Sequence, residues 1–132
     1  MALSNCMKAL YTLIASGTYP VSVGLRRAGD STPMIVYEVS QVDIDCLMIG
    51  GDAGHYTISV TADCVADTSL LAWTVASDLV DVFSGVYVDN AEDIKLVLSG
   101  VNATARTETP DDGQSDAERV VSVTLTILGK EI

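Results

Sequence analysis

The fold is decided by the segment from His55 to Ser84, which reads HYTISVTADCVADTSLLAWTVASDLVDVFS. Residues 55–66 alternate between apolar and polar side chains, and such alternation predicts a β-strand with one buried face and one solvated face. The apolar face would carry Tyr56, Ile58, Val60, Ala62 and Cys64, and the polar face would carry Thr57, Ser59, Thr61 and Asp63. An antiparallel sheet tolerates one wet face, so this strand predicts antiparallel pairing.

The second half of the segment, from Ser69 to Phe83, has helical spacing. Its apolar stripe comprises Leu71, Val75, Leu79 and Val82, with Ala72, Ala76 and Phe83 beside them. A stripe of this width needs a buried partner, and the apolar face of the preceding strand supplies one. Burial of each large side chain contributes roughly 1.5–3 kcal/mol before entropy is subtracted.

The other expected elements surround this pair. Apolar positions Leu3, Met7, Leu10 and Ile14 predict an N-terminal helix that Gly17 ends. We expect strands at 34–40, pairing with the Tyr56–Val65 strand, at 94–98 and 101–108 (one strand or two, around Ser99-Gly100), and at 118–128. We expect residues 18–33 to be irregular, 41–54 to be a long connection, 86–93 to cross between elements and 129–132 to be a short mobile tail.

These elements predict a single α+β domain over residues 1–132. It would be a two-layer sandwich in which a mainly antiparallel sheet carries its helices on one face.

Charge and hydropathy exclude several classes of function. Seven basic residues against 18 acidic ones give a net charge of −11, which argues against direct, tight binding of nucleic acid. Acidity would serve solubility, or a surface that DNA passes without adhering. The apolar runs are too short to span a bilayer, and the first residues lack the pattern of a signal peptide, so we expect a cytoplasmic start and no membrane contact.

No pattern in the sequence points to catalysis, a cofactor or a metal. Cys6, Cys46 and Cys64 lack paired spacing, and His55 is the one imidazole in the chain. The glycine-rich residues 50–54 precede a strand and lack the ending of a phosphate-binding loop. We therefore expect a protein that is not an enzyme.

Several residues are instead candidates for subunit or partner contacts. Arg26 and Arg27 form the one adjacent basic pair, which would either be solvated or meet a carboxylate on a neighbour. Apolar residues in the expected 41–54 connection suggest a hairpin that docks on another protein. They are Ile44, Leu47, Met48 and Ile49. Trp73 lies off the main stripe of its helix and would be either core rim or subunit contact.

An acidic loop at 109–116 contains Asp111, Asp112 and Asp116. It lacks the order of residues that an EF-hand calcium loop needs, so a solvated hairpin loop is the expected structure.

The order of these features resembles the tail terminator (tail-completion, minor tail) proteins of long-tailed phages and related gene-transfer particles. The matching features are the amphipathic N-terminal helix, the Pro33-Met34-Ile35-Val36-Tyr37-Glu38 strand, a glycine-bearing hairpin, the Tyr56–Val60 strand that runs into the 72–83 helix, and the acidic 108–112 loop before the Val121–Ile127 strand. The long 41–54 connection departs from the pattern.

The resemblance implies a virion protein of the tail and neck, assembled in the host cytoplasm. It would form a homo-oligomeric ring, expected to be a hexamer, that ends polymerisation of the tail tube and offers the surface for head–tail joining. Its partners would be the tail tube protein and a head–tail connector or stopper protein, and DNA would pass through the lumen without specific binding. Arg26 and Arg27 against the acidic loop of a neighbour would serve as a ring contact. Another neck component, or a small-ligand-binding α+β domain, is the alternative.

Overall fold

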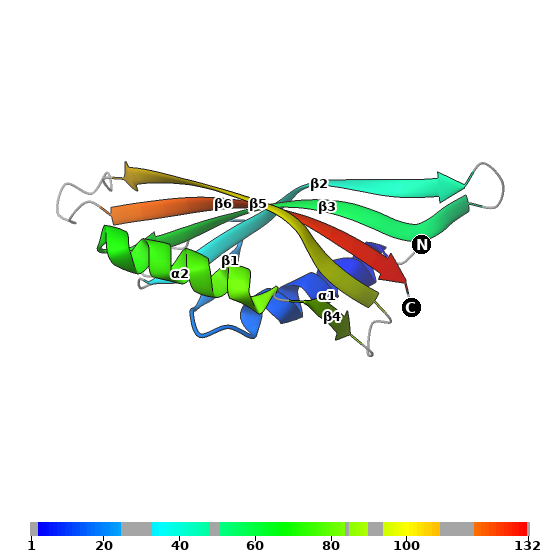
Figure 1. Cartoon of the computed structure of the whole chain (residues 1–132), viewed down its shortest axis with the longest axis horizontal. Coiled ribbons are helices and arrows are strands. Elements are labelled where there is room, and N and C mark those ends of the chain that lie inside the picture. The colour runs from blue at the N-terminus through cyan, green and yellow to red at the C-terminus, as the bar shows by residue number, and fades with distance from the viewer. Residues whose placement is uncertain are drawn as a thin grey trace.

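The described residues form two helices and a six-stranded, curled sheet, which confirms the α+β class (Figure 1). The computed structural model describes residues 3–24, 33–47, 51–83, 85–89, 94–108 and 118–131. In chain order the elements are α1 (Leu3–Ala15), β1 (Val21–Val23), β2 (Met34–Leu47), β3 (Gly51–Ala66), α2 (Ser69–Val82), β4 (Val86–Asp89), β5 (Ile94–Glu108) and β6 (Glu118–Glu131).

The order of strands across the sheet is β1-β2-β3-β6-β5-β4. Every pairing is antiparallel except that of β1 with β2. At the centre, β3 and β6 pair without a break from His55 opposite Lys130 to Ala66 opposite Arg119. The four long strands run side by side across the molecule, and the short β1 and β4 lie at the two edges (Figure 1).

The alternation predicted for β3 is confirmed. Its predicted apolar face is buried, with Tyr56, Ile58, Val60, Ala62 and Cys64 each at most 2% exposed, while the intervening polar residues are partly exposed. The last strand alternates in the same way, and its buried residues are Val121, Val123, Leu125 and Ile127. These two faces belong to one hydrophobic cluster with buried residues of both helices.

Both predicted helices are present. The buried residues of α2 are Ala72, Val75, Ala76 and Leu79, whereas Leu71 and Val82 of the expected stripe are only partly buried. At its start, Thr68 caps the helix by accepting a hydrogen bond from the Leu71 amide at 3.2 Å, which satisfies one of the unpaired first-turn donors. The helix packs against the central strands β3 and β6.

Two irregularities bend the sheet along one line. Ser40 is an extra residue in β2, between Val39 and Gln41, and Ser99 is an extra residue in β5, between Leu98 and Gly100. Both lie beside the same central pair, Ser59 opposite Thr126. Bulges increase local twist and bend a strand, so two of them in one row account for the curl visible in Figure 1.

Four expectations about the edges of the sheet are wrong. Residues 21–23 form β1 within the region expected to be irregular, and residues 86–89 form β4 where a crossing segment was expected. The expected connection at 41–54 is mostly strand, because β2 continues to Leu47 and β3 begins at Gly51. The expected mobile tail continues β6 to Glu131, where it pairs with Ile94.

Candidate interaction surface

Three of the residues proposed from sequence as contacts are described in the structure. Ile44 is partly buried and packs against the main core, and Leu47 ends β2 opposite Gly51. Trp73 is 44% exposed on α2, so it lies at the surface next to the even more exposed Leu70. The other residues lie outside the described part of the chain: Arg26, Arg27, Met48, Ile49, Asp111, Asp112 and Asp116.

The long strands β2 and β5 each have a partly unpaired outer side. On the outer side of β2, the short β1 covers only Ile35 to Tyr37, and Gly24 adds one hydrogen bond to the Tyr37 carbonyl. Beyond that point, no described residue pairs with Glu38–Leu47 on that side, and we call this stretch the β2 open edge. It contains exposed carboxylates at Glu38 and Asp43.

The outer side of β5 is open at the opposite end of the sheet. Strand β4 covers only Ile94 to Val97, and no described residue pairs with the outer side of residues 98–108, which we call the β5 open edge. Every side chain from Ser99 to Arg106 on this edge is exposed, including Val101 at 45%. An exposed edge of this length presents unpaired backbone donors and acceptors to any strand that approaches.

The polar face of the sheet carries one charged network in its described part. Arg106 donates to Asp63 Oδ2 at 3.1 Å and to Ser122 Oγ at 3.3 Å, and Ser122 in turn donates to the other oxygen of Asp63. Because Arg106 and Asp63 are both partly exposed, the ion pair contributes less than about 1 kcal/mol. The neighbouring side chains on this face are the uncharged hydroxyls of Thr57, Ser59, Thr61, Thr124 and Thr126.

A small apolar cluster lies on this same face at the end where β2 begins. It contains Met34, Val65 and Val120, each at most 5% exposed, with Val36 packed against them. Their register places them opposite each other across β2, β3 and β6. They therefore interrupt the polar face at this end.

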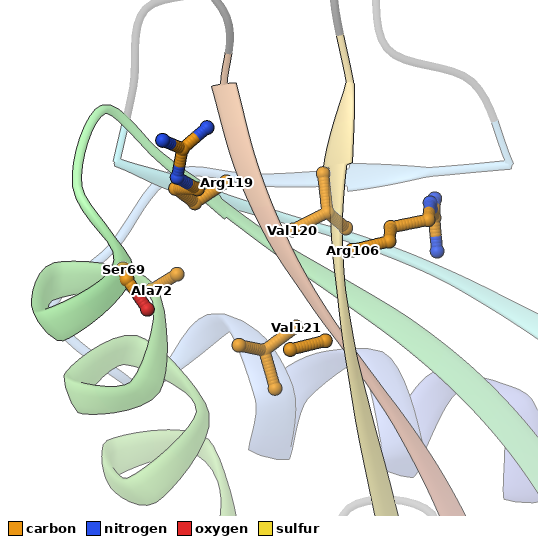
Figure 2. Close-up of a pocket in the computed structure, with 7 residues that line it drawn as sticks. Ser69, Ala72, Arg106, Arg119, Val120 and Val121 are labelled. Atoms are coloured by element: carbon orange, nitrogen blue, oxygen red, sulfur yellow. The ribbon is translucent and has the colours of Figure 1, made fainter.

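A cleft of about 180 Å³ lies between the start of α2, the end of β5 and the start of β6 (Figure 2). It is lined by Ser69, Ala72, Ala105, Arg106, Arg119, Val120 and Val121. In Figure 2, Ala72 and Val121 face one another across the cleft, and the Arg119 guanidinium rises at its rim. Among the described lining residues, Ser69 supplies a hydroxyl and Arg119 a guanidinium, whereas the Arg106 guanidinium points away from the cleft toward Asp63 and Ser122 (Figure 2).

A wider and more open groove, of about 550 Å³, follows α1. It is lined by Met7, Lys8, Tyr11, Thr12, Val23 and Tyr37. Burial raises the pKa of Tyr37 from 10.0 to about 12. The groove offers mostly apolar contact with one ammonium group.

The buried thiols are unreactive. Burial raises the pKa of Cys6 to about 11, and burial together with the nearby Asp63 raises the pKa of Cys64 to about 12. Since the thiolate is the nucleophile and the metal ligand, these two residues serve packing. Within the described ranges, no three His, Cys, Asp or Glu side chains gather as a metal site would require.

His55 is exposed on β3 and pairs across the strands with Asp45 and Lys130. None of the helices in the described part of the chain has the length and apolar character to cross a membrane.

Sequence reasoning missed the two open edges. The signal was present in part, since residues 99–106 carry small side chains with a single charge, but no pattern reveals which strands lie at the edge of a sheet. Comparison with protein-family models found no match, and the search of curated proteins found none either.

Proposed function

We propose that this chain is a structural virion protein that forms a ring at the head-proximal end of a phage-type tail tube. In this role it ends polymerisation of the tube and provides the joining surface for the head. The resemblance of the sequence to tail terminator proteins motivates the proposal, and the architecture supplies independent physical support.

The proposal includes a two-layer arrangement, with α1 and α2 on one face of the sheet. Its support is the single hydrophobic cluster that joins buried residues of both helices to the same alternate residues of β3 and β6. In Figure 1, both helices lie below the long strands. The opposite, hydroxyl-rich face then remains available as a lining surface.

The observation that carries the proposal is the pair of open edges. A closed ring requires two different, complementary surfaces on each subunit. The β2 open edge and the β5 open edge belong to opposite sides of one sheet, so each copy offers two distinct sites to its neighbours.

The charge of the chain suits a passage for DNA. The net charge of −11 repels phosphate, and the central part of the polar face carries hydroxyl groups around an internally paired Asp63 and Arg106. We therefore assign that face to the lumen, where DNA passes without specific binding.

Contacts with the tube and with a connector or stopper protein would use other surfaces. Leu70, 80% exposed, and Trp73 form an apolar surface on α2 that is suited to a partner protein. Met48 and Ile49, which follow the β2 open edge in the sequence, remain our second assignment, on the basis of their apolar side chains.

The test is localisation in assembled particles. A tagged copy of this chain, expressed with the particle that encodes it, should be labelled by gold-conjugated antibody at the junction of head and tail. Label at the tail tip, along the tube or on the capsid would refute the proposal.

A small-ligand-binding domain is the second candidate, and the groove beside α1 favours it. That groove is large enough for a small molecule and combines apolar walls with the ammonium group of Lys8. A ligand-binding protein would stay monomeric or dimeric and would lose ligand affinity when Tyr11, at the exposed wall of the groove, is replaced by Asp.

A further inference from the structure

The two open edges match each other in direction. Because β2, β3, β6 and β5 are successively antiparallel, β2 and β5 run in opposite directions in the sheet. A second copy placed beside the first in the same orientation would therefore bring its β2 antiparallel to β5. This is the pairing in which backbone hydrogen bonds run perpendicular to the strands.

The edges also match in length. The β2 open edge begins at Glu38, directly after the residues that β1 covers, and the β5 open edge begins at Leu98, directly after the residues that β4 covers. The β2 open edge has ten residues, one of them the extra Ser40, so the nine residues 98–106 can pair along it without reaching the residues that β1 or β4 covers.

Side-chain direction restricts the register. Val42 and Ile44 pack toward the core, and Val101 and Ala103 are opposite the core residues Leu125 and Val123. Registers that keep these faces together differ by two residues, because a shift of one reverses every side chain. The register that pairs residues 98–106 with Glu38–Leu47 sets Val101 opposite Ile44 and Ala103 opposite Val42.

The same register matches charge and hydrogen bonding on the polar face. It sets Asn102 opposite Asp43 and Thr104 opposite Gln41. The extra residue Ser40 then brings Arg106 opposite Glu38. Between residues 38 and 44 the acidic side chains are Glu38 and Asp43 and there is no basic one, whereas between 99 and 106 the single charge is that of Arg106. If the register shifts by two residues in either direction, Glu38 no longer lies opposite Arg106.

We infer that the β5 open edge of one copy pairs antiparallel with the β2 open edge of a second copy, in the register that sets Ala103 opposite Val42. This inference rests on the proposed ring and names its subunit contact. The sheet then continues from copy to copy, and the exposed Val101 is covered by the neighbour's Ile44.

Disulfide cross-linking tests the register directly. The variant carries Ala103→Cys and Val42→Cys in a Cys46→Ser background, because Cys6 and Cys64 are buried and unreactive. Residues directly opposite in an antiparallel pair have Cα atoms about 4.5–5.5 Å apart, within the range of a disulfide. Within one copy, β2 and β5 are separated by two strands, or about 14 Å, so no bond can form inside the chain.

The matched control is Val101→Cys with Val42→Cys in the same background, which is diagonal in the proposed register and roughly 7–8 Å apart. On mild oxidation, the Ala103/Val42 variant should give a ladder of covalent multimers, and the control should give roughly tenfold less product. Ala103→Cys alone should remain monomeric in denaturing gels. Equal unfolding midpoints establish that the variants are folded.

Other outcomes overturn the inference in distinguishable ways. A covalent dimer from Ala103→Cys alone would mean that two β5 edges pair with each other. Multi-copy particles without cross-links at 103 and 42 would refute this edge pairing while leaving the ring in place. A chain that stays monomeric and gives no cross-links would refute both the pairing and the ring.

Discussion

Gly129 on β6 lies directly beneath the thiol of Cys6 on α1. A methyl group placed on Gly129 would come within 2.9 Å of Cys6 Sγ and within 3.5 Å of side-chain carbons of Ile58 and Leu96. The close approach of α1 to the sheet therefore depends on the absence of a side chain at position 129. The N-terminal helix is fixed by this contact as well as by its apolar stripe.

Replacing Gly129 by Ala should lower the free energy of unfolding by about 1–3 kcal/mol, because Cys6, Ile58 and Leu96 are all buried and have little room to move. Urea denaturation measures the change. Gly100→Ala is the control, since a methyl group there meets only Thr126 Cβ at an ordinary 3.9 Å. If Gly129→Ala lowers the free energy of unfolding as much in a Cys6→Ala background as in the natural chain, the contact with Cys6 does not cause the loss of stability.

The helix cap at Thr68 makes a second prediction. Thr68→Ala removes the acceptor for the Leu71 amide and should destabilise the protein by about 1 kcal/mol. Thr74→Ala is the matched control, because the Thr74 hydroxyl donates to the Leu70 carbonyl within the same helix and caps nothing. Thermal unfolding should show a lower midpoint for Thr68→Ala and an unchanged one for Thr74→Ala; the reverse order would contradict the assignment of the cap.

The buried thiols predict a loss of stability at alkaline pH. The pKa of Cys64 is raised from 9.0 to about 12 in the folded chain, so between these values the unfolded state releases a proton that the folded state retains. Unfolding is then favoured as pH rises, and the stability present below pH 9 should fall by about 1 kcal/mol by pH 10 from Cys64. Cys6 acts in the same direction.

Urea midpoints at pH 8 and pH 10 measure this effect. In Cys64→Ala, the difference between the two pH values should shrink, even though the variant is less stable at both because of the lost packing. An undiminished difference would assign the alkaline sensitivity to other groups.

Arg26 and Arg27 give a prediction about self-association that rests on the sequence alone. Replacing both Arg26 and Arg27 by Glu should weaken self-association by roughly tenfold, or about 1.4 kcal/mol, if they meet a neighbour's acidic loop. Lys8→Glu with Lys95→Glu changes the net charge equally and should have a smaller effect, since both lysines are exposed elsewhere. Sedimentation across a concentration series compares the two; equal weakening would show that net charge alone is responsible.

The interior of this fold can be predicted from sequence because burial imposes a period. Apolar and polar side chains alternate without interruption from Tyr56 to Cys64 on β3 and from Val121 to Ile127 on β6. The sequence therefore shows which face of each strand is buried. The same holds for the stripe of α1. At positions that must be buried, the apolar residue types follow the period of the helix or strand and so predict it.

The periphery could not be predicted for equally physical reasons. Strand β1 has three residues and β4 has four, which is too short for a period to show. In β2 the bulge at Ser40 moves the core-facing apolar side chains from odd to even residue numbers. The alternation is broken at that point, and the sequence therefore predicts that the strand ends there. Gly129 resembles a terminator, yet it is a site of close packing inside β6.

The candidate site was predicted only in part. Trp73 is exposed on α2, and Ile44 packs against the core of its own chain from a strand where the sequence predicted a connection. The open edges depend on which strands neighbour one another, and that is a property of the completed sheet.

We propose that the working unit of this protein is a ring of identical copies. Native mass spectrometry of the purified chain tests the ring most directly. The measurement is made at concentrations at which sedimentation shows a single species. We expect a closed assembly with about six times the 13.9 kDa mass of one chain. A single species of 13.9 kDa at every concentration would contradict it.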